Sequence, residues 1–393
     1  MSTTETRAAR GPRHSRRAPG THRALRVVLV AALFMVTFTG TGAALAYQSL
    51  QGGVERHDID DILGTDRPST DSGDGDSETQ NPDDALDGQA INILVMGTDS
   101  REGEDNQAVG GGNVQGMRSD TTLLIHVSAD RSRVDVVSIP RDLLVTIPSC
   151  PLPDGGSTYE QYDAMFNAAF AMGGRTVGVE YRAACTWRTV EAMSDIAIDD
   201  FVVVDMAGFR DMVDAIGGVD MCFEQDMYSE QANLDITAGC HTLDGETALA
   251  VARARKGVGL GDGSDIGRID RQQELLTNMV EQVLDRNMMT DAGELFQFLR
   301  AATSSLTTSD QIGDLTTMAG LAYSLRGIQR DEVNFATMPF DWAGDRVRPN
   351  YLSEELWASI RADEPMALPP DPDATDEATG ASTEVAEGSE DVG

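Results

Sequence analysis

Residues 200–224, DFVVVDMAGFRDMVDAIGGVDMCFE, contain in one run the pattern that decides the fold class. DFVVVDM (200–206) is a short apolar run of the kind that forms a buried strand. AGFRDMVDAIGG (207–218) has the spacing of a short helix and stops at two glycines, which favour helix termination. VDMCFE (219–224) then indicates another strand. Strands that alternate with helices predict an α/β fold.

The alternation continues on both sides of this run. Upstream, the predicted strands are INILVMG (91–97), TTLLIHVS (121–128) and RVDVVSIP (133–140), and the predicted helices cover 164–172, with Phe166 and Phe170 on one face, and 178–196. Downstream, helices are predicted over 243–255 (with Asp244 as a candidate N-cap), over 271–288 and in two or three weaker segments of 291–327, and a late strand over 332–338. The whole set predicts a mixed central sheet flanked by helices.

The N-terminal residues predict a membrane anchor. Residues 1–26 hold seven arginines against one glutamate, and residues 27–54 carry no charge. About 20 apolar residues span a bilayer, and a basic flank stays in the cytoplasm. We therefore expect a cytoplasmic basic arm (1–26), one transmembrane helix (27–49) and a single-pass cell-membrane protein whose bulk lies outside the cytoplasm. The alternative is a cleaved signal peptide ending near Ala44-Leu45-Ala46, which also places the bulk outside.

Two acidic segments border the predicted domain. Residues 50–90 are rich in Asp, Ser and Gly, and residues 363–393 hold ten acidic side chains and no basic one. Because neither composition buries a core, we expect a disordered linker and a disordered tail around one domain at 91–362. The chain has a formal net charge of −35, which argues against nucleic acid as a partner, since phosphate backbones require a basic face.

Four cysteines suit an exported protein with up to two disulfides. They are Cys150, Cys185, Cys222 and Cys240, and they permit three pairings. Proximity in the sequence favours Cys150 with Cys185 and Cys222 with Cys240. Their spacing is unlike that of zinc ligands.

The segment VARARKGVGLGDGSDIGRIDRQQ (251–273) gathers five positive side chains around a glycine-rich loop, in an otherwise acidic chain. This cluster predicts a strongly anionic ligand, because guanidinium groups bind phosphate oxygens bidentately. The alternative for each arginine is a surface charge that balances nearby acids. Together with RSD (118–120) and IPRD (139–142), the candidate arginines are Arg118, Arg141, Arg253, Arg255, Arg268 and Arg271.

Two details limit what this segment does. Arg253 and Arg255 lie two residues apart, so either the helix ends there or only one of them faces the site. The loop GVGLGDG (257–263) could flex over a ligand, but it lacks the GK[ST] of a nucleotide-binding loop. A kinase or an ATPase is therefore disfavoured.

Two aspartates lie where the first two strands are expected to meet. Asp99 follows the first strand and Asp120 opens the second, so their carboxylates come together if the strands are sheet neighbours. Such a pair suits Mg²⁺, which binds one or two carboxylates with waters and phosphate oxygens. A cation with arginines is the usual arrangement for phosphoryl transfer. The alternative is that each aspartate caps a turn.

Nucleophile motifs are weak. The sequence contains no G-x-S-x-G turn, and the only histidines after residue 90 are His126 and His241. His126 lies within a predicted strand, a position typical of a core residue, and His241 lies in a predicted turn. Ser-His-Asp catalysis is therefore disfavoured.

Six ordered blocks over about residues 91–290 resemble the LytR-CpsA-Psr family of exported cell-envelope proteins. The predicted anchor and external domain also fit the topology of that family. The blocks are NILVMGTDSR, MRSDTTLLIHV, VDVVSIPRD, DDFVVVDMAGFRDMVDAIGGVDM, GCHTLDGETALAVARARKG and SDIGRIDRQQELL.

The resemblance implies an α/β fold with a long hydrophobic pocket for a polyprenyl pyrophosphate lipid. It also implies a Mg²⁺-dependent phosphotransferase that moves a lipid-linked glycopolymer to peptidoglycan. Asp99 and Asp120 match the metal-binding aspartates, and Asp265 matches the position assigned to proton transfer. The matches to the pyrophosphate-binding set are Arg118, Arg141, Arg253, Arg255, Arg268, Arg271 and Gln272, and of these Arg118, Arg141 and Arg268 count with Asp265 as catalytic.

A lipid tail requires apolar walls, because burial contributes about 0.8 kcal/mol per CH₂. Candidate walls are Phe166, Phe170, Phe201 and Met279, with ordinary core residues as the alternative. Two other functions stay open. One is a hydrolase that cleaves polyprenyl pyrophosphates with water, and the other is a non-catalytic, lipid-binding envelope protein.

Overall fold

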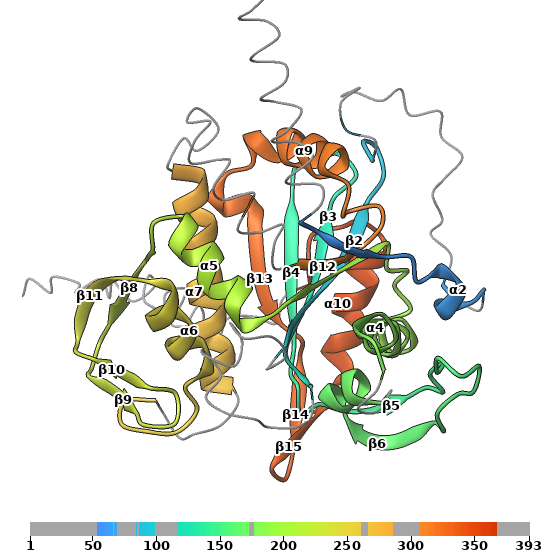
Figure 1. Ribbon diagram of the computed structural model, residues 1–393, viewed down its shortest axis with the longest axis horizontal. Coiled ribbons are helices and arrows are strands. Elements are labelled where there is room, and N and C mark those ends of the chain that lie inside the picture. The colour runs from blue at the N-terminus through green and yellow to red at the C-terminus, as the bar shows by residue number, and fades with distance from the viewer. Residues whose placement is uncertain are drawn as a thin grey trace, which may run out of the picture. The chain divides into compact units, whose positions relative to one another are not determined.

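The computed structural model describes residues 53–65, 67–68, 84, 86–98, 117–172, 177–260, 266–285, 300 and 306–367. The chain divides into two compact units, Met1–Ser49 and Leu50–Gly393, and every described residue belongs to the second. A mixed seven-stranded sheet forms the centre of this unit (Figure 1). In spatial order its strands are β1 (Glu55–His57), β12 (Leu306–Ser309), β7 (Asp200–Val204), β2 (Ile91–Thr98), β3 (Ser119–Val127), β4 (Val134–Ile139) and β13 (Val333–Thr337).

Five of the six predicted strands are confirmed in the central sheet, as β2, β3, β4, β7 and β13. β2 is parallel to β7 and antiparallel to β3, so the sheet is mixed as expected. The β2–β3 register runs from the pair Ile91 and Val127 to the pair Thr98 and Ser119. The end of β2 and the start of β3 therefore meet, as the hypothesis of a shared aspartate site requires.

The helices predicted over 178–196, 207–218, 243–255 and 271–288 form with shifted ends, and the described part of 291–327 contains one α-helix, Leu315–Ser324. The largest shift is at α7, which begins five residues before the predicted position. The α-helices are α2 (Asp60–Leu63), α4 (Val179–Ser194), α5 (Met206–Ala215), α6 (Gly245–Arg253), α7 (Ile266–Asp285), α9 (Leu315–Ser324) and α10 (Tyr351–Arg361). Short 3₁₀ segments are η1 (Phe166–Ala171), which replaces the helix predicted over 164–172, η2 (Leu325–Gly327) and η3 (Arg330–Glu332).

Eight strands form two-stranded hairpins outside the central sheet. They are β5 (Leu144–Ile147) with β6 (Gln161–Met165), β8 (Val219–Phe223) with β11 (Gly239–Leu243), β9 (Met227–Ser229) with β10 (Leu234–Ile236), and β14 (Phe340–Ala343) with β15 (Arg346–Pro349). The strand predicted over 219–224 therefore exists but does not join the main sheet. Its residues alternate between buried Val219 and Met221 and exposed Asp220 and Cys222, so only one face packs.

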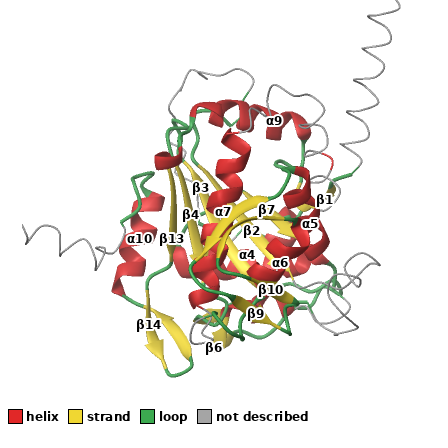
Figure 2. Ribbon diagram, turned by 90° about the vertical axis from the view of Figure 1, so that its left-hand side faces the viewer, coloured by secondary structure: helices red, strands yellow, loops and turns green. Residues whose placement is uncertain are grey.

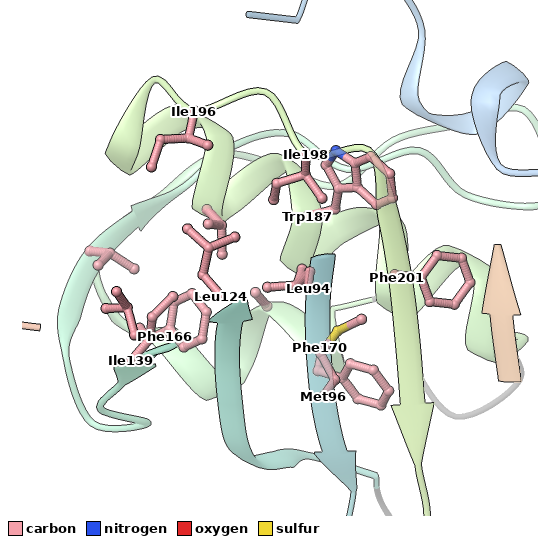
Figure 3. Close-up of a cluster of buried hydrophobic side chains, with 14 of the residues drawn as sticks. Leu94, Met96, Leu124, Ile139, Phe166, Phe170, Trp187, Ile196, Ile198 and Phe201 are labelled. Carbon is pink, nitrogen blue, oxygen red and sulfur yellow. The ribbon is translucent and has the colours of Figure 1, made fainter. Parts of the chain in front are cut away.

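One face of the sheet carries the largest core. Leu94 and Met96 of β2 and Phe201 of β7 point into it, where they meet Trp187 of α4 and Phe170 of η1 (Figure 3). Trp187 and Phe201 make an edge-to-face contact with ring centroids 6.4 Å apart. Helices α4 and α10 cover this face, on the side of the sheet opposite to α5, α6 and α7 (Figure 1). Large rings therefore fill this side of the molecule.

The alternate residues of the same strands point to the other face. Ile91 and Ile93 of β2 pack there with Ile312 and with Leu321 of α9, which lies over one end of the sheet in both views (Figures 1 and 2). A separate apolar cluster joins α5, α6 and α7 to the β8–β11 and β9–β10 hairpins. Neither cluster covers the end of β2 near Thr98, which faces the space between the sheet and the helices α5, α6 and α7.

The segment expected to be a linker contributes to the fold. Residues 55–57 form β1, which pairs with β12 at the edge of the sheet, and α2 places Leu63 in the large core, where the side chain is fully buried. Arg67 donates to both carboxylate oxygens of Glu191 and stacks on Trp187. The prediction of a disordered linker over 50–90 is therefore wrong for these residues. The few apolar side chains among the acidic ones are sufficient to dock this segment on the core.

The C-terminal boundary also lies beyond the predicted residue 362. Asp363 accepts hydrogen bonds from the backbone N–H of Ala129 and from Arg133, and it contacts the ring of His126. His126 is a core residue, as expected, and its burial lowers its pKa even though Asp363 opposes the shift. Met366 packs against the large core. The remainder of the predicted tail, 368–393, lies outside the described residues.

Both predicted disulfides are present. Cys150 pairs with Cys185, which ties the β5–β6 connection to α4, and Cys222 pairs with Cys240 across the β8–β11 hairpin. Among the helices of the described residues, none is long and apolar enough to cross a membrane. The predicted arm (1–26) and transmembrane helix (27–49) lie outside the described residues.

Candidate active site

A cavity of about 560 Å³ lies between the sheet and the helices α5, α6 and α7. Its floor is the end of β2, where Gly97 pairs with Thr121 of β3 on one side and Val204 of β7 on the other. Its polar wall residues include Asp120, Asp205, Arg253, Arg255, Arg268 and Gln272, and its apolar ones include Leu123, Phe209, Met212, Leu249, Leu275, Leu276 and Met279.

Helix α7 contributes both polar and apolar residues to the wall of the cavity. Arg268, Gln272, Leu275 and Met279 are spaced by four, three and four residues, which places them on one face of the helix. The charged residue lies in the first turn and the apolar residues follow it toward the C-terminus. The cavity therefore has a charged part next to a long apolar part, which suits an amphiphilic ligand.

The end of α6 resolves the question about Arg253 and Arg255. The helix begins after the N-cap Asp244, whose side chain accepts the N–H of Thr247 at 2.9 Å, and it ends at Arg253. The following residue, Ala254, is extended. Both arginines line the cavity because the chain changes direction between them.

The described part of the glycine-rich loop is held in place. Val258 exchanges two backbone hydrogen bonds with Tyr228 of β9, at 2.9 and 3.0 Å. Gly257 and Gly259 adopt φ values of 153° and 71°, and a Cβ at either position would lie about 2 Å from a β9 or neighbouring carbonyl oxygen. Residues 257–259 are therefore packed against β9 and the residue before it, while 261–265 lie outside the described residues.

Asp120 is the centre of the charged part. Its Oδ1 accepts from Arg141 Nη1 at 3.0 Å and its Oδ2 from Arg255 Nη2 at 2.8 Å. Arg268 Nη2 donates to the Asp120 carbonyl oxygen at 3.0 Å. Burial would raise the pKa of this carboxyl group, but the charges of the three arginines outweigh burial and lower the pKa of Asp120. Asp120 is therefore ionised at neutral pH.

The predicted arginines differ in how they reach the cavity. Arg253, Arg255 and Arg268 line it, and Arg268 does so with a side chain that is only 2% exposed. Arg141 is joined to the cavity through Asp120, and Arg118, which precedes β3, is exposed. The structure thus brings three of the predicted arginines, Arg141, Arg255 and Arg268, to Asp120, and Arg253 lines the same cavity.

Arg271 and Gln272 support the backbone that carries the arginines. Arg271 donates to the carbonyl oxygens of Ala254, at 2.7 Å, and Leu260, at 3.4 Å. Gln272 donates to the Ala252 carbonyl at 2.9 Å and accepts from the Thr121 hydroxyl at 3.1 Å. Gln272 also lines the cavity, whereas Arg271 is not among its wall residues. Arg271 contacts the backbone at both ends of the loop, and its predicted contact with pyrophosphate stays a prediction.

The predicted apolar walls are corrected in part. Phe166, Phe170 and Phe201 pack in the core on the far face of the sheet, whereas Met279 lines the cavity. Sequence reasoning missed Phe209 and Met212 of α5, which form the opposing wall. Their three-residue spacing in AGFRDMVDAIGG was visible, but it does not reveal whether a helix face meets a core or a cavity.

Two of the predicted site residues, Asp99 and Asp265, lie outside the described residues. Among the residues that the structure describes, no group of three or more His, Cys, Asp or Glu side chains gathers as a metal site. The donor chemistry of Asp120 nevertheless fits Mg²⁺, because an ionised carboxylate that faces a cavity is a hard oxygen ligand. A magnesium ion here would be held by Asp120 and, if the sequence hypothesis holds, by Asp99.

A profile of the LytR_cpsA_psr family matches residues 59–357, which is more than half of the chain. The chain belongs to the LytR-CpsA-Psr family. The matched range includes α2, every strand of the central sheet except β1, and the whole cavity.

Among LytR-CpsA-Psr relatives, the "Probable cell wall biosynthesis protein LcpB" of Corynebacterium glutamicum is 32% identical over 277 residues, which cover 69% of this chain and 61% of that protein. The "Polyisoprenyl-teichoic acid--peptidoglycan teichoic acid transferase TagU" of Oceanobacillus iheyensis is 28% identical over 275 residues, which cover 70% of this chain and 72% of that protein. The alignment thus spans less than two thirds of LcpB.

The fold is that of solved LytR-CpsA-Psr structures. The "LytR-Csp2A-Psr enzyme from Actinomyces oris" aligns with a TM-score of 0.53 at 20% identity, over 78% of this chain and 95% of that one. TagV of Bacillus subtilis aligns with a TM-score of 0.50 at 23% identity, over 70% of this chain and 96% of that one. These likenesses concern the fold alone.

Proposed function

We propose that this protein is a phosphotransferase that moves a glycopolymer, as a glycosyl phosphate, from a polyprenyl pyrophosphate carrier to a hydroxyl group of peptidoglycan. The observation that carries the proposal is a single cavity with arginines and Asp120 at one part and apolar side chains along the rest. A lipid pyrophosphate has the same division into a charged head and an apolar tail. The printed name of the Oceanobacillus iheyensis relative describes a transfer of this kind.

Binding follows from the two parts of the cavity. Arg253, Arg255 and Arg268 neutralise the pyrophosphate, because guanidinium groups bind phosphate oxygens with paired hydrogen bonds. The apolar walls bury part of the lipid tail, at about 0.8 kcal/mol per CH₂. Arg271 and Gln272 keep the backbone between Ala252 and Leu260 in place, so the arginines need no reorganisation when the donor binds.

The transfer itself exchanges one phosphorus–oxygen bond for another. The acceptor hydroxyl oxygen attacks the phosphorus that carries the sugar, the bond to the bridging oxygen breaks, and polyprenyl phosphate leaves. The arginines stabilise the negative charge that grows on the leaving phosphate. Mg²⁺ held by Asp99 and Asp120 would add positive charge to the same oxygens. The family resemblance assigns the hydroxyl proton to Asp265.

The proposed location is the outer face of the cell membrane, with one transmembrane helix at 27–49. The basic arm before this segment supports the orientation. Two disulfides in the folded unit also suit an oxidising compartment outside the cytoplasm.

The full-length protein, purified in detergent, tests the proposal with Mg²⁺, a synthetic polyprenyl pyrophosphate-linked disaccharide and peptidoglycan. We expect release of polyprenyl phosphate and a sugar phosphate bound to peptidoglycan. Release that does not require peptidoglycan, with free sugar phosphate as the product, would instead identify a hydrolase. Donor binding without release of any product would identify a lipid-binding protein.

Arginine variants locate the reaction in this cavity. Arg268→Ala is expected to lower kcat/KM by about 100-fold or more, because it removes a charge from the transition state. Since Arg268 is buried, Arg255→Ala is the companion variant, with a side chain that is 36% exposed. Arg330→Ala is the matched control, because Arg330 is 73% exposed and pairs with Glu281 away from the cavity wall. Equal turnover in all three variants would remove the reaction from this site.

A further inference from the structure

We propose that Asp205 receives the proton of the acceptor hydroxyl during transfer. The proposal rests on the phosphotransferase function above, and it gives to Asp205, within the described part of the cavity, the proton that the family resemblance assigns to Asp265. Asp205 follows the last residue of β7, and its side chain lines the cavity.

The sheet register places Asp205 opposite Asp120 across the end of β2. Gly97 pairs with Thr121 on one side and with Val204 on the other. Asp120 precedes Thr121 and Asp205 follows Val204, so the two aspartates flank Thr98 from the neighbouring strands. Two strand spacings separate their backbones by on the order of 10 Å. Strand β2 lies between them, and both aspartates line the cavity on the same side of the sheet end.

The other titratable groups of the described wall are poorly suited to accept a proton. Arg253, Arg255 and Arg268 carry guanidinium groups, which donate hydrogen bonds and have no acceptor site. Asp120 has both carboxylate oxygens bonded to guanidinium groups and is held in its ionised form. Asp205 is the other carboxylate among the described wall residues. A general base has to reach the reacting hydroxyl directly or through one water molecule, and a cavity-wall position meets this requirement.

Asp205 is also held in a fixed orientation. It is the N-cap of α5, and its Oδ1 accepts the backbone N–H of Gly208 at 2.7 Å. A carboxylate held in this way is already oriented when the acceptor hydroxyl binds. In the reaction, the hydroxyl proton moves to the Asp205 carboxylate while the hydroxyl oxygen bonds to phosphorus. The electron pair of the breaking phosphorus–oxygen bond leaves with polyprenyl phosphate, and Asp205 later releases its proton to water.

The N-cap role makes a clean test possible. Asn caps helices about as well as Asp, so Asp205→Asn keeps the bond to Gly208 and removes only the basic oxygen. Asp244→Asn is the matched control, because Asp244 caps α6 in the same way and does not line the cavity. Both variants are made in the full-length protein and assayed with the lipid-linked disaccharide, peptidoglycan and saturating Mg²⁺.

We expect Asp205→Asn to lower kcat by about 100-fold or more, with the KM for the donor and the half-saturating Mg²⁺ concentration changed by less than about threefold. Asp244→Asn should retain wild-type kcat. The proposal is overturned if Asp205→Asn keeps its kcat, if extra Mg²⁺ restores it, or if Asp265→Asn alone stops transfer. A wild-type protein that transfers nothing overturns the proposed function itself, which separates the two failures.

Discussion

The two faces of the central sheet are built from the same strands but filled in opposite ways. On one face, β2 and β7 place Leu94, Met96 and Phe201 against Trp187, and these large side chains leave a closed core. On the other, the same strands end at Thr98 and Val204 and leave a cavity of about 560 Å³. The comparison teaches that strand alternation creates two environments, and that the side chains of the facing helices decide which one becomes a site.

Phe201 and Phe209 lie in one stretch of the sequence, and their replacement by alanine should give the largest difference in stability. Phe201 is fully buried in the core, so Phe201→Ala should lower the free energy of unfolding by about 3 to 5 kcal/mol. Phe209 lines the cavity, and Phe209→Ala enlarges a space that already exists, so we expect a loss on the order of 1 kcal/mol. Denaturant unfolding of both variants measures the difference.

Donor binding should show the reverse order for the same pair. Phe209→Ala is expected to weaken binding of the lipid-linked disaccharide, and Phe201→Ala is expected to leave it unchanged at temperatures where the variant is folded. Equal losses of stability would mean that the two faces are packed alike and that the cavity wall is ordinary core.

The disulfides divide between the same two sides. Cys150–Cys185 joins the β5–β6 connection to α4, a helix of the closed core, while Cys222–Cys240 joins the β8–β11 hairpin near the helices of the cavity. Loop-closure entropy grows with sequence separation, which is 35 and 18 residues. Loss of the bonds should therefore cost about 4 and about 3 kcal/mol.

Cys150→Ser with Cys185→Ser and Cys222→Ser with Cys240→Ser, each as a double variant, test this order by thermal unfolding. Wild-type protein in a reducing agent should show the combined loss. A larger loss for the Cys222–Cys240 pair would show that the hairpin depends on its disulfide more than loop length indicates.

The fold could be predicted where a strand carries its own signal. INILVMG, TTLLIHVS and DFVVVDM are apolar runs long enough to form strands in any sheet, and all three do. LTTS of β12 and ERH of β1 are short and polar, and they become strands only because β7 offers an edge to β12 and β12 offers one to β1. Such tertiary pairing leaves no local trace in the sequence.

The residue types of the site could be predicted from the sequence, but the contact that each residue makes could not. The clustered arginines were visible as a charge anomaly, and three of them surround Asp120 while Arg253 lines the same cavity. Arg271 was grouped with them by charge, although its guanidinium group donates to the carbonyl oxygens of Ala254 and Leu260. Asp205 gave no signal of its own, because an aspartate before a helix is a common N-cap.

Two aspartates near opposite ends of β2, Asp199 just before β7 and Asp120 in β3, sharpen the comparison through pH. Burial raises the pKa of Asp199 to about 6, whereas the arginines around Asp120 lower its pKa. A raised carboxyl pKa stabilises the protein fully below the unfolded value near 4, and this stability is lost as pH rises through about 6. Asp199→Asn removes the ionisation and can still accept the N–H of Asn92, which Asp199 Oδ2 accepts at 2.7 Å.

We therefore expect Asp199→Asn to be more stable than wild type at pH 8, by on the order of 2 to 3 kcal/mol, and nearly equal to it at pH 4. Asp120→Asn has the opposite sign, because the lowered pKa of Asp120 contributes stability above about pH 4 that is lost as pH falls. Urea unfolding of the three proteins at both pH values measures this. A destabilised Asp199→Asn at pH 8 would contradict the raised pKa.

The smallest change in stability is expected at the cavity floor. A Cβ at Gly97 would lie 3.4 Å from the Thr121 Cβ, a contact that needs little adjustment. Gly97→Ala also reduces the conformational freedom of the unfolded chain, so the free energy of unfolding should change by less than about 1 kcal/mol. The added methyl group nevertheless occupies the place where β2 ends between Asp120 and Asp205. If the pyrophosphate lies there, the KM for the donor rises while stability is kept, and an unchanged KM would place the headgroup elsewhere along the cavity.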